Sequence, residues 1–275
     1  MQRSYIFQQV KPRLVRWFLL LILVICSGQA SWGEDLMPWQ ETRRIAAPAA
    51  HQAAVAERRF VYAVTSHLIE KYDRSSGQLL ATSSGPALHL NSGFLWKGQV
   101  LSAHSNYPRM PEESEIKILN PQTMQLTTWH SFHDYGGSLT WVVRRRDTWL
   151  CNFALYDEKN HQTFLVEFDN DWKELQRWSY PPELIGELGT FSLSGGVWYQ
   201  NGLLVTGHDK PEVYRVTIPQ RGRQLVLQGR AEVPFTGQGI AVDPETGGLV
   251  GISRAEQQII FAEQKPKQQS NRSRQ

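Results

Sequence analysis

Two histidines and an arginine are the residues of this sequence best suited to chemistry. His104 and His208 stand at equivalent places near the ends of two apolar segments, and Arg254 ends a third such segment. Two imidazoles that face one cavity can act as general acid and general base, and a guanidinium can bind a substrate carboxylate. These three are the catalytic candidates, with a structural role as the alternative for each histidine. Asp209 follows His208 directly, but strand neighbours point to opposite faces, so we do not expect these two side chains to pair.

A second set of polar residues could hold a ligand. Its members recur at the beginnings and ends of short apolar segments and are mostly uncharged, as in sites for small polar molecules. The candidate ligand-binding residues are Gln52, His89, Asn91, Ser105, Asn106, Ser138, Ser194, Asp209 and Gln238. The alternatives are structural: Ser138 and Ser194 could be small because the backbone turns closely there. Gln52 and Gln238 share one repeat position and could bridge neighbouring units.

Other kinds of chemistry lack a signal in the sequence. A Ca²⁺ or Zn²⁺ site needs several carboxylates, or three to four His, Cys and acidic ligands. The segment beginnings that carry the polar residues contain no carboxylate, so we expect no metal site and no cofactor. The nucleophile motif Gly-x-Ser-x-Gly is also absent from the sequence.

The elements that must position these residues are revealed by a phrase that occurs five times. The phrase ends at Asp73, Asn120, Asp169, Thr217 and Glu263, and reads IEKYD, IKILN, LVEFD, VYRVT and IIFAE. Its spacing is 47, 49, 48 and 46 residues. Periods of about 40–50 residues built from short alternating strands predict a circular array of four-stranded sheets, the β-propeller. The fold class is therefore all-β, with five blades.

The blade plan places the polar residues on one rim. In each unit a first strand leads through a tight turn to an apolar second strand, and the repeated phrase forms the third strand. Because neighbouring strands are antiparallel, the beginning of each first strand and the end of each second strand lie on the same face. We therefore expect the candidate residues to surround one mouth of the central channel. Loops on that face would add His133, Asp134, Tyr107 and Tyr156.

The fifth blade lacks a fourth strand of its own, because only polar residues follow Glu263. The segment 39–47 precedes a proline in the same way as the outer strand of the fourth blade. It is expected to complete the last blade and close the ring, since closure removes unpaired sheet edges. The predicted propeller spans 34–263, and the tail 264–275 is predicted to be disordered.

The first 33 residues have the pattern of a secretory signal peptide. Residues 1–16 carry four bases and no acid, residues 17–26 are apolar, and small residues follow. The apolar run is short for a transmembrane helix, which needs about 20 residues. Cleavage after Ala30 or after Gly33 fits the pattern, with an uncleaved anchor as the alternative. The expected location is secreted or periplasmic.

Charge and cysteine content limit the classes of partner that the chain is expected to bind. Of 29 Lys and Arg, four lie in 1–33 and four in the tail, which leaves 21 against 26 acidic residues in the predicted propeller. A mildly acidic domain without a basic patch does not indicate nucleic acid binding. Cys151 is the one cysteine outside the leader, in an apolar strand, where a thiol is usually a small hydrophobe. We expect a monomer whose partner is a small molecule or a glycan.

Several short motifs resemble a known family. HLNSG (89–93), AHSNYP (103–108), SGGVW (194–198), TGHD (206–209) and GQGIA (237–241) resemble uncharacterised secreted propellers of environmental bacteria, planctomycetes among them. The phrase IEKYDRSSGQLL also resembles the less specific YVTN and quinoprotein-like repeats. Some members of that family are labelled cycloisomerase, which implies at most the formation or opening of a lactone-type ring. The resemblance assigns no residue roles.

Two functions remain open from the sequence. The first is an exported propeller that binds a small polar ligand at the channel mouth without catalysis. The second is an enzyme of the lactonase or cyclase kind, in which His104 and His208 are acid and base and Arg254 binds a carboxylate.

Overall fold

The computed structural model describes residues 34–264, and most of their regular structure is β-strand. The predicted signal peptide (1–33) lies outside the described residues, as does the polar tail from residue 265 on. Gln264, which the sequence placed in the tail, is the last residue of a strand. The strands form four sheets.

The largest sheet contains both ends of the described chain. Its order is β2-β22-β21-β20-β3-β4-β5-β6. Its strands are β2 (Trp39–Ala46), β3 (Ala53–Ala56), β4 (Phe60–Val64), β5 (Ile69–Asp73), β6 (Leu79–Thr82), β20 (Thr236–Val242), β21 (Leu249–Ser253) and β22 (Gln258–Gln264). One parallel pair, Gly239 with Ala53, joins its two antiparallel four-stranded halves. In one half, N-terminal β2 pairs antiparallel with C-terminal β22.

The other three sheets are formed by the chain between these halves, with one strand added from the N-terminal side. The second sheet contains β7 (His89–Leu90), β8 (Phe94–Trp96), β9 (Gln99–Ser105), β10 (Ser114–Asn120) and β11 (Gln125–His133). The third contains β12 (Ser138–Arg145), β13 (Thr148–Ala154), β14 (Phe164–Phe168) and β15 (Glu174–Ser179). The fourth contains β16 (Gly195–Tyr199), β17 (Gly202–Thr206), β18 (Glu212–Thr217), β19 (Val226–Glu232) and β1 (Glu34–Asp35), the last parallel to β19.

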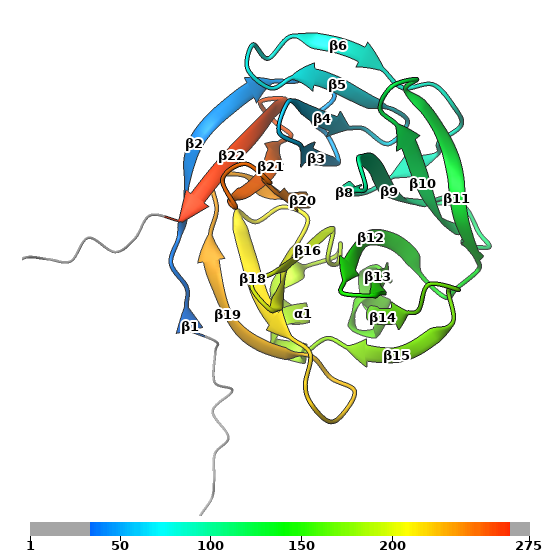
Figure 1. The fold of residues 1–275 in the computed structure, drawn as a ribbon. Helices are drawn as coiled ribbons and strands as arrows, with labels where there is room; N and C mark the ends of the chain where they lie inside the picture. The colour runs from blue at the N-terminus through cyan, green and yellow to red at the C-terminus, as the bar shows by residue number, and fades with distance from the viewer. Residues whose placement is uncertain (1–33, 265–275) are drawn as a thin grey trace, which may run out of the picture. The chain divides into compact units, whose positions relative to one another are not determined.

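The innermost strands face a common centre (Figure 1). In succession, β3 contacts β8, β9 of the same sheet contacts β12, β12 contacts β16, β16 contacts β20, and β20 contacts β3. The outer strands β6, β11, β15 and β19 lie at the periphery (Figure 1). This arrangement makes the ends of the inner strands converge.

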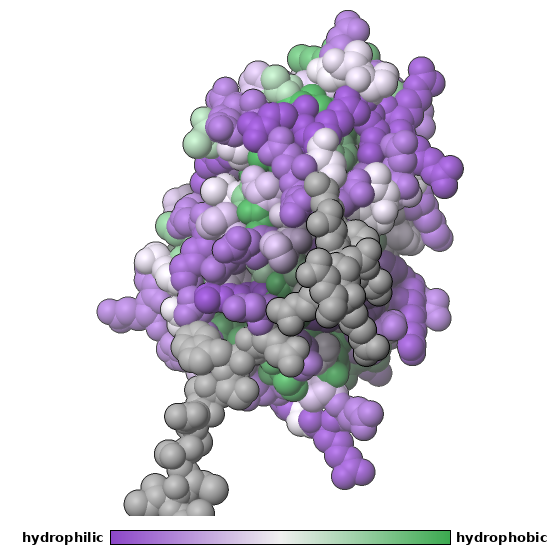
Figure 2. Space-filling model, turned by 90° about the vertical axis from the view of Figure 1, so that its left-hand side faces the viewer, coloured by the Kyte–Doolittle hydropathy of each residue, from purple (hydrophilic) through white to green (hydrophobic). Residues whose placement is uncertain are grey.

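The sequence explains the strands and their turns. Inner and middle strands such as β3 and β13 are buried on both faces and are therefore nearly continuous apolar runs. Outer strands such as β19 alternate between exposed and buried residues, the pattern of a sheet with one face in water. Figure 2 shows the outer surface over this side of the molecule as mostly hydrophilic. Tight hairpins use residues with positive φ, among them Gly98 at φ 75 and Asn201 at φ 62.

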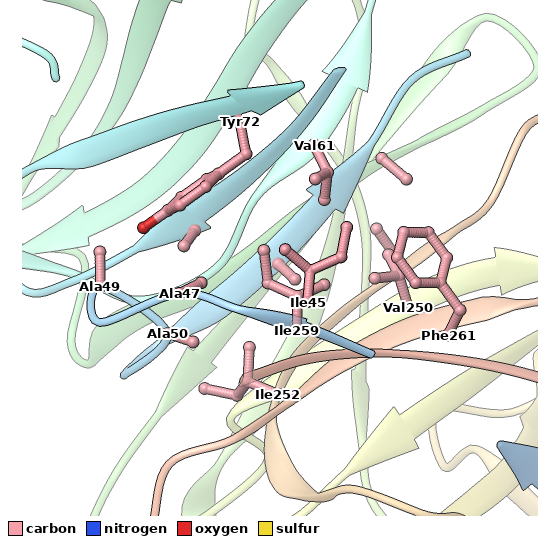
Figure 3. Close-up of a cluster of buried hydrophobic side chains, with 14 residues drawn as sticks. Ile45, Ala47, Ala49, Ala50, Val61, Tyr72, Val250, Ile252, Ile259 and Phe261 are labelled. Carbon is pink, nitrogen blue, oxygen red and sulfur yellow. The ribbon is translucent and has the colours of Figure 1, made fainter. Parts of the chain in front are cut away.

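Apolar clusters between the sheets form the core. One cluster combines Ile45 of β2, Val61 of β4, Tyr72 of β5, Val250 of β21 and Phe261 of β22, together with their neighbours (Figure 3). It therefore packs the two ends of the chain against each other. A second cluster stacks the aromatic residues of the second and third sheets, which include Trp149 and Phe153. Cys151 is buried in this same cluster, as the apolar strand predicted.

The structure departs from the repeat plan at three places. The 3₁₀-helix η1 (Asp157–Gln162) follows β13, and helix α1 (Pro182–Leu188) precedes β16. None of the helices in the described part of the chain is long and apolar enough to cross a membrane. The predicted strand that begins at His89 is divided into β7 and β8, and Gly93 between them lies so close to Val55 that a side chain there would overlap it.

A glycine beneath the converging strands gives a testable result for the packing. A methyl group on Gly195 would overlap the Gln238 carbonyl and lie 2.9 Å from the Cα of Gly239. We expect Gly195→Ala to lower the free energy of unfolding by about 1–3 kcal/mol, because overpacking displaces backbone. The control is Gly186→Ala in α1, where no atom lies within 4 Å of the added carbon. Urea denaturation should show a loss for the first variant and none for the second, and equal midpoints would contradict this account.

Candidate functional site

A pocket opens where the inner strands converge. Its volume is ≈ 230 Å³, and it is lined by Gln52, His89, Asn91, Tyr107, Thr140, Tyr156, Phe191, Ser194, His208, Gln238 and Arg254. All four sheets, or the loops that follow their strands, contribute to this lining. The pocket is therefore built by chain segments far apart in the sequence, as the rim geometry predicted for a ligand site.

Several lining residues stand directly before or shortly after a strand. Gln52 immediately precedes β3, and Ser194 immediately precedes β16, so both come from first-strand beginnings. Arg254 directly follows β21, and His208 lies two residues after the end of β17, so both come from second-strand ends. Seven of the catalytic and ligand-binding candidates line the pocket: Gln52, His89, Asn91, Ser194, His208, Gln238 and Arg254.

His208 is held between an acid and a cation. Its Nδ1 lies 2.5 Å from Oδ1 of Asp209, and its Nε2 lies 3.3 Å from Nη1 of Arg254. Because a guanidinium only donates, Nε2 must be the acceptor and the ring proton must be on Nδ1, which donates to Asp209. Nε2 of His208 is thus turned toward Arg254 at the pocket wall.

The expectation that His208 and Asp209 point to opposite faces is wrong. That rule holds within a strand, and β17 ends at Thr206, so both residues lie in the bend that follows it. Because neither residue belongs to a strand, the two side chains can turn toward each other. Asp209 itself is exposed, does not line the central pocket, and supports His208 from the solvent side.

Aromatic rings form a continuous series along one side of the pocket. Consecutive ring centroids are 5.6 Å apart for His89 and Tyr107, 5.0 Å for Tyr107 and Tyr156, 6.0 Å for Tyr156 and Phe191, and 4.7 Å for Phe191 and His208. We call these five residues the aromatic belt. Burial, together with Glu112 and Tyr107, raises the pKa of Tyr156 to about 12, so its hydroxyl stays protonated and able to donate.

Carboxamides line the other part of the wall and are fixed in orientation. Nδ2 of Asn91 donates to the carbonyl of Leu139 at 2.8 Å. Nε2 of Gln238 donates to the carbonyl of His208 at 3.0 Å. Since a carbonyl cannot donate, these contacts fix which end of each amide is nitrogen. Gln238 also has φ 88, a strained value for a residue with a side chain, of the kind found at functional sites.

His104 is not part of this pocket, which corrects the proposed pair of catalytic histidines. It lies within β9 with 4% of its surface exposed. Its Nε2 accepts the backbone N–H of Leu88 at 2.9 Å, and its Nδ1 lies 3.2 Å from Glu115. Burial and the neighbouring Lys117 lower its pKa to about 4, so it is neutral and structural. The equivalence with His208 fails because β9 continues to Ser105, whereas β17 stops before its histidine.

Three further candidates lie behind the wall rather than in it. Ser105 is buried, with Oγ 3.5 Å from the amide nitrogen of Asn91. Asn106 fixes the loop that follows β9, accepting from the N–H of Glu113 and donating to Pro111. Ser138 donates to Glu112 at 3.1 Å. Glu112 is half-buried, and burial raises the pKa of its carboxyl.

Sequence reasoning missed two lining residues. Thr140 lies inside β12 and donates to the carbonyl of Leu193 at 2.8 Å, which anchors the loop before β16. Phe191 lies on that loop, after α1, and has no counterpart in the other repeats. The phrases on either side of it, which end at Asp169 and Thr217, are 48 residues apart, so the repeat spacing gave no signal for it. Of the loop residues expected at the rim, Tyr107 and Tyr156 line the pocket, while His133 and Asp134 do not.

The donor set gives no support for a metal ion. Within residues 34–264, no group of three or more His, Cys, Asp and Glu side chains could hold one. The side chains that line the pocket include no Asp or Glu. A neutral or anionic organic ligand therefore suits the site better than a cation.

Comparison with known proteins supports the fold. No family model and no curated protein sequence matches the chain. A crystal structure of glutaminyl cyclase from Myxococcus xanthus, a β-propeller enzyme, is similar with a TM-score of 0.59 at 11% identity, over 84% of this chain and 98% of that one. A structure of the mitotic checkpoint complex reaches only 0.46 at 9% identity, over 95% and 98%. The chain thus has a propeller-like all-β fold.

Proposed function

We propose that the chain is an exported five-bladed β-propeller whose central pocket binds a small polar ligand. Five blades follow if the two halves of the largest sheet count separately, since each half has four antiparallel strands. The pairing of β2 with β22 then closes the ring. Export rests on the signal-peptide pattern of residues 1–33, and N-terminal sequencing of the mature protein would test it.

The observation that carries the binding function is the convergence of polar side chains from all four sheets on one pocket. Amides, hydroxyls, imidazoles and one guanidinium meet there beside an aromatic wall. Concave sites with a few fixed polar groups on a largely preformed wall are typical of small-molecule binding. Because the backbone at the pocket floor is tightly packed, the site is preorganised, which lowers the entropic cost of binding.

A blocking variant tests the site. Ser194 is half-buried, lines the pocket and has no hydrogen bond among the described residues, so Ser194→Leu should fill space without unfolding the chain. In a thermal-shift screen of sugars and organic acids, a ligand at 100 times its Kd should raise the Tm of the wild type by about 5–10 °C. Ser194→Leu should abolish that rise. Thr127→Leu on the exposed face of β11 is the control and should keep it; equal shifts in all three proteins would place the ligand elsewhere.

A second candidate function is supported by the Asp209–His208 pair. An acid that orients a histidine, with the basic nitrogen of that histidine at a pocket wall, is the arrangement used for general acid–base catalysis. With Arg254 as the carboxylate-binding group, the pocket could open or close a lactone ring. His208 alone then takes the role that the sequence divided between two histidines.

A further inference from the structure

The pocket contains a guanidinium that lacks an anionic partner. Arg254 is half-buried, and among residues 34–264 it forms no ion pair. Its Nε donates to the carbonyl of His51 at 2.9 Å, and Nη1 lies 3.3 Å from Nε2 of His208. Within the described chain, Nη2 has no hydrogen-bond partner. The nearest acid, Asp209, is on the far side of the His208 ring and is exposed to solvent.

An incompletely solvated cation of this kind favours an anionic ligand. Burial lowers the pKa of Arg254, and the charge of Asp209 offsets this only in part. The planar guanidinium matches a carboxylate, which can accept two parallel hydrogen bonds from it. No Asp or Glu lines the pocket to compete for these donors.

The side-chain amides of Asn91 and Gln238 set a second requirement for the ligand. The nitrogens of Asn91 and Gln238 are committed to backbone carbonyls, so their oxygens are the ends left for a ligand. Neither oxygen is among the buried polar atoms that lack a partner, and both residues line the pocket, where the Asn91 side chain also contacts His89. Amide oxygens accept hydrogen bonds, so the ligand groups beside them must be donors.

Those donors are more compatible with hydroxyls than with an ammonium group. An ammonium would enter a pocket that already holds Arg254 and has no carboxylate in its lining, so like charges would repel. Hydroxyls meet the amide oxygens without adding charge. The aromatic belt offers ring faces and edges, against which the C–H face of a compact ring can pack.

We propose that the ligand of this pocket is a sugar acid of the uronate class, a hydroxylated ring that carries one carboxylate. Arg254 binds the carboxylate, Asn91 and Gln238 accept from ring hydroxyls, and the aromatic belt packs against the ring. This inference rests on the proposed binding function, and it goes further by naming the charge and the polarity of the ligand.

Isothermal titration of the purified chain with four probes tests the proposal. Glucuronate carries every proposed feature, glucose lacks the carboxylate, benzoate lacks the hydroxyls, and glutamate adds an ammonium group. Glucuronate should bind with a Kd at least about tenfold lower than each other probe, since one charge-assisted contact is worth about that factor or more. Glucose binding as tightly as glucuronate would overturn the carboxylate assignment, and benzoate or glutamate binding as tightly would overturn the hydroxyl assignment.

Variants of Arg254 test whether this residue binds the carboxylate of glucuronate. Arg254→Gln should raise the Kd of glucuronate about 10–100-fold and leave that of glucose nearly unchanged, whereas Arg254→Lys, which keeps the charge, should lose less. Arg58→Gln, at an exposed position between β3 and β4, is the matched control and should bind as the wild type does. If Arg254→Gln binds glucuronate as well as the wild type, the inference is wrong.

The failures of the two proposals can be told apart. If a wider panel yields a ligand that Ser194→Leu excludes but that is neutral or cationic, the pocket binds a ligand and the sugar-acid inference falls. If no compound in that panel binds in a manner sensitive to Ser194→Leu, the binding function falls, and the inference falls with it.

Discussion

Asp243→Ala should lower the free energy of unfolding by about 3–5 kcal/mol, the usual cost of breaking a buried ion pair. Both carboxylate oxygens of Asp243 lie 2.7 Å from the guanidinium of Arg74, and the two side chains are only 2% and 10% exposed. Arg74 follows β5 and Asp243 follows β20, so the pair links the N-terminal and C-terminal halves of the largest sheet. Arg74 also contacts Glu245 at 2.8 Å, but that carboxylate is 56% exposed and compensates the buried guanidinium only in part once Asp243 is lost.

The matched control is an arginine–carboxylate ion pair that is exposed to solvent. Glu41→Ala removes the partner of Arg44 on β2, where the side chains are 29% and 45% exposed, and should cost at most about 1 kcal/mol. The double variant Arg74→Met with Asp243→Ala should be more stable than the sum of the single losses predicts, because the only charge left unpaired is the exposed carboxylate of Glu245. Urea unfolding measures all of these, and strictly additive losses would contradict the coupling.

The ion pair between Arg74 and Asp243 should also make the free energy of unfolding depend on pH. Burial by itself raises the pKa of Asp243, but the hydrogen bonds from Arg74 and the backbone of Glu245 outweigh it and hold that pKa below its ordinary value of 3.8. A carboxyl with a depressed pKa stabilises the folded state above its ordinary pKa, and this stability is lost as pH falls through the folded value. The difference in stability between wild type and Asp243→Ala should therefore be constant near pH 7 and shrink below pH 3.8.

The strands could be predicted from the sequence because the repeated phrase marks the same strand of every unit. The phrases ending at Asp73, Asn120 and Thr217 correspond to β5, β10 and β18, which end at those same residues. Each of these strands is hydrogen-bonded on both sides, so its apolar positions recur in every repeat. The loops face no such common constraint, and for that reason α1 and η1 left no periodic signal.

The pocket could be predicted in part for a related reason. Antiparallel pairing fixes which strand ends share a face, and this alone brought Gln52, Gln238 and Arg254 to one region. Side-chain direction depends on where each strand stops, and the repeat does not encode this. His104 and His208 occupy equivalent places in the alignment, yet one lies inside a strand and the other beyond the end of one.

If the pocket is catalytic, His208→Gln should lower kcat/KM about 10²–10⁴-fold, the range typical of a lost general acid–base group. In lactone hydrolysis, Nε2 of His208 would take a proton from the attacking water as the new C–O bond forms. It would return that proton to the ring oxygen as the ring C–O bond breaks, which yields a hydroxy acid. Glutamine is chosen because its side-chain oxygen can still accept from Arg254, so the position of the guanidinium is kept.

Binding and turnover should separate in these variants. His208→Gln should retain the thermal shift produced by a hydroxy acid, because Arg254 and the amides remain, while proton release from a lactone in a pH-stat assay falls. Asp209→Asn should lose only about tenfold, since the Asp209 carboxylate is 80% exposed and well screened. His161→Gln, an exposed histidine of η1 outside the pocket, is the control. Full activity in His208→Gln, or a wild type that opens no lactone, would leave this pocket as a binding site and remove the catalytic candidate.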